Sequence, residues 1–143
     1  MIYPLSDSLR WALQFGANPS FSAADWLARE VAPECATVNE AILEKSESAE
    51  KDLQRLRTLK SAFKTLRLTG ETTDDRRAGA KYYAAVIAAA IVRHGIRISS
   101  QRPGRLQDAL EDLRNDEDIC SEIRALATKA IERLENEIIP EDS

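Results

Sequence analysis

The sequence predicts an all-α protein, a single-domain bundle of five or six helices around a central, buried, alanine-rich helix over residues 78–94. Residues 78–92 read AGAKYYAAVIAAAIV and are apolar or small on nearly every side. A helix without a polar face lies either at the centre of a bundle or in a membrane. Apolar residues also recur at helical spacing in the flanking segments. No segment shows the alternating pattern or the Asn-Gly turns that are typical of strands.

Length and composition suit one folded domain. The chain has 143 residues, of which 43% are hydrophobic and 31% are charged, enough to bury a core. The apolar central segment is shorter than the about 20 residues that a membrane span needs, and arginines flank it. The N-terminus lacks the basic and apolar regions of a signal peptide. We therefore expect a cytoplasmic protein with no membrane contact.

Residues 1–33 are expected to form two short N-terminal helices. Ser6 can cap the first helix, which the segment 16–19 (GANP) ends. Pro33 then stops the second helix, because proline cannot continue a helix beyond its first turn.

A long amphipathic helix is expected over residues 38–68. Thr37 and Glu40 have the spacing of a capping box at its start. The apolar stripe weakens over residues 44–51, where the helix must be solvated or interrupted. The stripe can pack on the central helix, which we favour, or on a second copy, which would give a homodimer. Its members recur every seven residues, at Ile42, Ala49, Leu56 and Phe63.

The central helix is expected over residues 73–94, followed by a C-terminal helical hairpin over residues 103–138. Asp74 and Asp75 suit the first turn of the central helix, where the helix dipole favours negative charge. Gly95 suits the position just past its end. The hairpin is expected to turn at the acidic segment 115–118 (NDED), where the apolar phase breaks.

Charge is segregated along the chain, although the net charge is only −4. Residues 51–67 hold six basic residues against Asp52 alone. Residues 76–107 contain no Asp or Glu, and from Asp108 onward twelve carboxylates face four basic residues. The basic residues of 76–107 are Arg76, Arg77, Lys81, Arg93, Arg97, Arg102 and Arg105.

Three explanations can account for this segregation of charge. The acidic hairpin can pack across the basic segments, so that the charges pair at helix edges. Alternatively, arginines gathered around the connection over 93–105 can form an anion-binding surface for phosphate or nucleic acid. A protein partner with an acidic face is the third option. Arginine suits bidentate pairing with either carboxylate or phosphate, so the preference for arginine does not distinguish between these explanations.

Few residues carry catalytic or metal-binding patterns. Cys35 and Cys120 lie far apart without metal-ligand spacing, and we expect two reduced thiols. Asp108 and Asp112 lie one helical turn apart, but a solvated acidic face explains them better than a cation does. His94 is the only histidine, so a general-base mechanism using imidazole would have to use it; a C-terminal dipole partner is the simpler role. We therefore expect no metal, no cofactor and no enzyme.

Residues 80–96 (AKYYAAVIAAAIVRHGI) resemble the central helix of HEPN-type domains. These are small α-helical bundles in which such a helix often follows a long amphipathic one. HEPN ribonucleases carry an arginine and a histidine separated by four to six residues, but with His94 as the histidine the candidate positions 87–89 are Ile, Ala and Ala. The resemblance therefore implies a non-catalytic member: a partner of a nucleotidyltransferase, or a nucleotide- or RNA-binding module.

The sequence as a whole favours a non-enzymatic interaction or regulatory module that binds a protein partner, with homodimerisation as one option. The alternative is a HEPN-like module that binds RNA or a nucleotide through the basic 93–105 loop. The residues expected at that site are Tyr82, Arg93, His94, Arg97, Arg102 and Arg105.

Overall fold

The computed structural model describes residues 28–29, 32–35, 37–70, 73–97 and 103–138. The two N-terminal helices expected within residues 1–33 lie almost entirely outside this part of the chain. The described residues form an all-α bundle without strands, which confirms the predicted fold class. Its helices are α3 (Val38–Leu43), α4 (Ala49–Thr69), α5 (Thr73–His94), α6 (Pro103–Arg114) and α7 (Ser121–Ile138).

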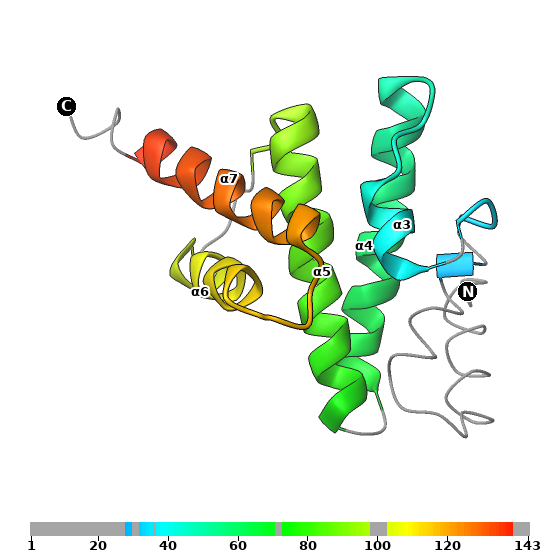
Figure 1. Ribbon diagram of the computed structural model, residues 1–143, viewed down its shortest axis with the longest axis horizontal. Helices are drawn as coiled ribbons and strands as arrows, with labels where there is room; N and C mark the ends of the chain where they lie inside the picture. Colours follow the sequence, from blue (N-terminus) through cyan, green and yellow to red (C-terminus); the bar gives the residue numbers. More distant parts are fainter. Residues whose placement is uncertain (1–27, 30–31, 36, 71–72, 98–102, 139–143) are drawn as a thin grey trace.

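Helix α5 is the centre of the bundle, as its composition predicts. It packs against α4 on one side and against α6 and α7 on the other (Figure 1). The small side chains along α5 let its neighbours approach closely. Gly79 marks the tightest point, since a Cβ atom built there would lie 2.4 Å from the backbone nitrogen of Arg67 on α4. The alanines Ala85, Ala88 and Ala89 of α5 are also fully buried.

The helix expected over residues 38–68 is divided into α3 and α4. The break falls at residues 44–48, within the stretch where the apolar stripe weakens. The Thr37 hydroxyl caps α3 by accepting a hydrogen bond from the Glu40 amide, as the sequence predicts. Ser48 starts a new helix in the same way, because its hydroxyl accepts from the Lys51 amide. A second cap inside the segment favours two helices over one.

The apolar stripe of α4 packs within the chain, onto α5. Leu56, Leu59, Phe63 and Leu66 are all at most 1% exposed in the single copy. The ring of Phe63 lies 5.4 Å from the ring of Tyr82 on α5, a separation typical of favourable aromatic pairs. These four residues of the stripe are therefore already buried within the single copy.

Helices α6 and α7 form the expected C-terminal hairpin. Residues 115–120 connect them, and Leu110 and Ile123 are fully buried between the helices and α5. Lys81 of α5 reaches the turn, where its Nζ atom lies 2.9 Å from Oδ2 of Asp116. At the end of α5, Gly95 takes the left-handed conformation (φ 60°), as expected of a glycine in that position. No helix in the described ranges is long and apolar enough to cross a membrane.

Candidate functional site

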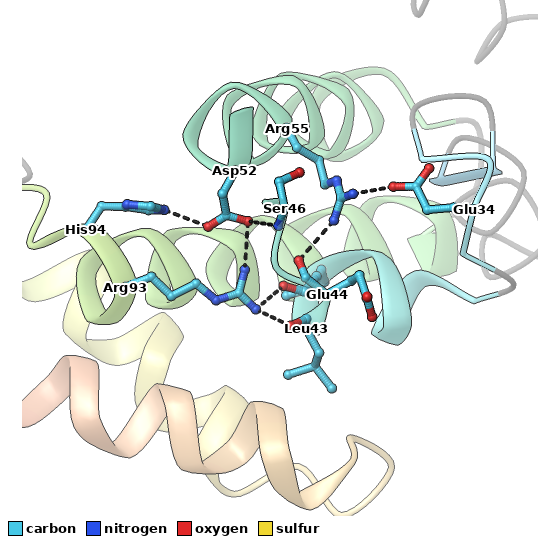
Figure 2. Close-up of polar contacts among 9 residues, drawn as sticks. Glu34, Leu43, Glu44, Ser46, Asp52, Arg55, Arg93 and His94 are labelled. Carbon is cyan, nitrogen blue, oxygen red and sulfur yellow. Dashed lines mark hydrogen bonds and ion pairs between the residues drawn. The ribbon is translucent and has the colours of Figure 1, made fainter. Parts of the chain in front are cut away.

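A buried polar junction joins the start of α4 to the end of α5. Asp52 is 3% exposed. Its Oδ2 lies 2.6 Å from Nε2 of His94, and its Oδ1 lies 3.5 Å from Nη1 of Arg93 (Figure 2). The Ser46 amide also donates to Oδ1, over 3.4 Å. A carboxylate this deeply buried needs such partners, because an unpaired buried charge is strongly destabilising.

Arg93 extends the same junction to α3. Its Nη2 donates to the carbonyl oxygens of Ile42, at 2.7 Å, and Leu43, at 2.5 Å. These carbonyls belong to the last turn of α3, which lacks partners within its own helix. Burial lowers the pKa of the Arg93 guanidinium from its ordinary value, and the nearby Asp52 carboxylate opposes that shift. The polar contacts of the junction thus hold α3, α4 and α5 together.

Arg55 fastens the same region from its outer side. Its Nη1 donates to the carbonyl of Glu44 at 2.9 Å, and its Nη2 forms an ion pair with Glu34 (Figure 2). Arg55 and Arg93 together hold the segment between α3 and α4 in place. Arg55 and Arg93, which belong to the basic segments 51–67 and 76–107, therefore stabilise the fold.

The structure does not gather the six predicted site residues on one surface. Tyr82 is 3% exposed and packs on Phe63, and the Arg93 and His94 side chains point into the junction with Asp52 (Figure 2). Burial of α5 on both sides is the physical reason. Arg97 and Arg105 are exposed on the connection and on α6. Arg102 lies outside the described residues.

A different basic surface lies along one side of α4, beside its buried stripe. We define the α4 basic face as Arg57, Lys60, Lys64 and Arg67, which recur at three- and four-residue spacing and so share one side of the helix. Arg57, Lys60 and Lys64 are exposed, and none forms an ion pair with another described residue. Arg67 lies over the half-buried ring of Tyr83, 4.7 Å from its centroid, in a cation–π contact.

The sequence shows six basic residues over 51–67, but these four were not identified from it as one side of the helix. The helical phase is the signal that distinguishes them. Arg55 lies toward the α3–α4 junction. Each residue of the α4 basic face instead follows a buried residue of the stripe by one position, about 100° around the helix, so the face lies beside the stripe. No carboxylate occurs over residues 53–69, so no acidic side chain of α4 interrupts this face.

Carboxylates collect on the other side of α5. A shallow pocket of about 250 Å³ lies between α5 and α6, lined by Arg77, Lys81, Asp112 and Asp116 among others. Burial alone would raise the pKa of Asp116. The hydrogen bond from Lys81 and that from the Asp118 amide outweigh burial and bring the pKa below its usual value. Lys81–Asp116 is the one ion pair between the basic segment 76–107 and the acidic hairpin within the described ranges.

Potential metal ligands and thiols are dispersed. No group of three or more His, Cys, Asp or Glu side chains in the described part of the chain is placed to hold a metal ion. Cys35 is buried and Cys120 half-buried, and both are free thiols. Burial raises the pKa of the Cys35 thiol, with the Glu34 carboxylate adding to the shift, which disfavours the reactive thiolate.

Comparisons of the chain with protein-family models, with curated proteins and with solved structures found no match. The resemblance of residues 80–96 to HEPN-type domains stays a prediction.

Proposed function

We propose that this chain is a non-enzymatic helical interaction module and that it binds an anionic partner through the α4 basic face. The observation that carries the proposal is the row of exposed cations Arg57, Lys60 and Lys64, which form no ion pair with another described residue and lie on a helix side without carboxylates. Surface cations of a stable protein are usually interspersed with anions. A single-sign row is a surface for attracting opposite charge.

The groups best suited to chemistry are already engaged in the fold. His94 contacts the buried Asp52 carboxylate, and Arg93 contacts Asp52 and the carbonyls of α3. A general base must reach a proton on a substrate, and this imidazole is turned toward a buried carboxylate. That arrangement supports an interaction role.

The α4 basic face suits a polymer of closely spaced charges, such as a nucleic-acid backbone. Arg57 and Lys64 are seven residues apart, or about 10 Å along the helix axis. Lys and Arg contacts to phosphates supply sequence-independent affinity without an apolar contact. Leu68 is the one exposed large hydrophobic residue in the described ranges, whereas stable protein–protein interfaces have an apolar centre and few lysines. Binding to RNA, which the sequence suggested for the 93–105 loop, thus finds better support on α4.

The test is fluorescence anisotropy of a labelled single-stranded RNA titrated with the protein at several salt concentrations. The logarithm of the association constant should fall linearly with the logarithm of salt concentration. Replacing both Lys60 and Lys64 by Gln should weaken binding and reduce that slope by roughly 1.4, because each phosphate contact to a single strand contributes about 0.7.

The matched control also removes two exposed lysines, Lys45 and Lys129, which lie outside the α4 basic face. Lys45→Gln with Lys129→Gln has the same net charge as the test variant and should keep the wild-type slope. Equal effects of the two pairs would refute a localised site. Loss of binding on Arg97→Glu but not in the Lys60 and Lys64 variant would move the site to the 93–105 loop. Absence of binding at low salt would end the proposal for nucleic acid.

A further inference from the structure

The anionic and cationic surfaces of this chain lie on opposite sides of α5. Helix α4 packs on one side of α5, and α6 and α7 pack on the other (Figure 1). The α4 basic face lies beside the buried stripe of α4, and its half-buried member Arg67 lies over the Tyr83 ring of α5. Among the described residues, no ion pair joins the α4 basic face to a carboxylate of α6 or α7 within one copy.

The acidic surface centres on the connection between α6 and α7. We define the acidic turn as the exposed carboxylates Asp112, Glu117, Asp118 and Glu122. None of the four forms an ion pair with another described residue. Of the two arginines in this stretch, Arg124 is half-buried and its Nε donates to the Arg114 carbonyl.

The two surfaces carry opposite charge. Residues 53–69, which carry the α4 basic face, have five basic and no acidic residues. Residues 108–124, which carry the acidic turn, have seven acidic and two basic residues. Complementary charge guides one surface to another and sets their relative orientation.

We propose that the acidic turn of one copy docks on the α4 basic face of a second copy. Such a contact joins two different surfaces, so it is heterologous, and repetition extends it into an open head-to-tail chain. Leu68 is the one exposed large hydrophobic residue in the described part of the chain, so the contact lacks the apolar centre of a stable interface and is a weak, mainly electrostatic one. Salt therefore weakens it, as it weakens any pair of exposed charges.

This inference uses the same face as the proposed function and adds regulation to it. A neighbouring copy on the α4 basic face occupies the lysines that contact an anionic polymer. Self-association and RNA binding then compete, so RNA should shorten the assemblies and higher protein concentration should weaken apparent RNA affinity. The free face is most available at low protein concentration.

Sedimentation velocity over a range of protein concentrations, at low and at high salt, tests the assembly. The basic-face variant carries Lys60→Gln and Lys64→Gln, and the acidic-turn variant carries Glu117→Gln and Asp118→Asn. The wild-type protein should grow beyond a dimer with concentration at low salt and return to monomer at high salt. Each variant alone should stay monomeric at concentrations where the wild type assembles.

An equimolar mixture of the two variants is the decisive sample. The intact acidic turn of the basic-face variant fits the intact basic face of the acidic-turn variant, and each of the two remaining surfaces has lost two of its four charges. The mixture should therefore form a one-to-one pair and nothing larger. A wild-type assembly that stops at a dimer, persists at high salt or survives in both variants would overturn the inference, as would a monomeric wild type.

RNA titration of the acidic-turn variant separates the two proposals. This variant keeps the α4 basic face, so it should bind RNA at least as tightly as the wild type while failing to assemble. If RNA binding fails in every form but the wild type still assembles as described, the self-association proposal stands and the nucleic-acid proposal falls. Far-UV circular dichroism of each variant checks that these exposed substitutions leave the helices intact.

Discussion

Asp52 and His94, forty-two residues apart in the chain, meet through a 2.6 Å contact between Oδ2 and Nε2. The contact closes the α4–α5 pair at the end opposite the loop that joins the two helices. Arg93 adds α3 to the same point through the carbonyls of Ile42 and Leu43. Three helices are therefore held by one buried carboxylate and its two neighbours, Arg93 and His94 (Figure 2).

Asp52→Asn should lower the free energy of unfolding by about 3 kcal/mol, because it leaves the Arg93 side chain without its buried counter-charge. The two α3 carbonyls still accept from Arg93, which places the loss at the lower end of the usual range for a broken buried pair. Urea denaturation followed by circular dichroism measures it. Glu132→Gln, an exposed position on α7, should change stability little, and a similar loss there would contradict the assignment.

Gly79→Ala should destabilise the protein by about 1–3 kcal/mol, the usual cost of overpacking. The new Cβ would meet the backbone of Arg67 at 2.4 and 2.8 Å, and backbone cannot move aside as a side chain can. Helix propensity alone would favour alanine at this position by about 1 kcal/mol, so the sign of the effect tests the packing.

Gly104→Ala is the matched control, because Gly104 also lies within a helix and nothing lies within 4 Å of its would-be Cβ. The substitution should be neutral or stabilise the protein by up to about 1 kcal/mol. Opposite signs at Gly79 and Gly104, measured by thermal unfolding, are expected. The same sign at both positions would mean that α4 and α5 do not approach as closely as described.

Lys81→Gln should destabilise the protein near neutral pH and have little effect in strong acid. The pKa of Asp116 lies below its usual value in the folded chain because Lys81 donates to it. A depressed carboxyl pKa stabilises the fold above the unfolded value, near 3.9, and this stabilisation is lost as pH falls through the folded pKa.

The expected loss for Lys81→Gln is about 0.5–1 kcal/mol at pH 7, since both side chains keep partial exposure. Urea denaturation at about pH 7 and about pH 2.5 gives the comparison, provided that the wild type remains folded at both. Lys129→Gln, on the exposed side of α7, should show no such pH dependence. A loss for Lys81→Gln that is unchanged in acid would disprove the role of Asp116.

The helices were largely predictable from sequence because helical periodicity and capping are local properties. The alanine-rich run of α5, the Thr37 cap and the role of Gly95 were all read from neighbouring residues, and each is confirmed. The break between α3 and α4 was only partly predicted from the sequence. The stripe weakened there, but the competing Ser48 cap was not recognised.

The candidate surfaces depended on contacts between distant segments. By sequence, Arg93 and His94 were polar residues at the end of a helix, beside an irregular connection. Side chains that point into the bundle and side chains that point to solvent were both consistent with that position. Only the packed bundle brings Asp52 beside both and turns them inward. Likewise, Tyr82 enters the core because Phe63 of α4 lies against it.

The sequence by itself determined the fold class, the central position of α5 and the segregation of charge along the chain. The tertiary structure decided which basic side chains make contacts between helices and which remain exposed on the surface. The physical reason is that a helix presents several sides, and only packing selects the side that is buried. That selection leaves Arg57, Lys60 and Lys64 exposed on α4 and places the acidic turn beyond α5.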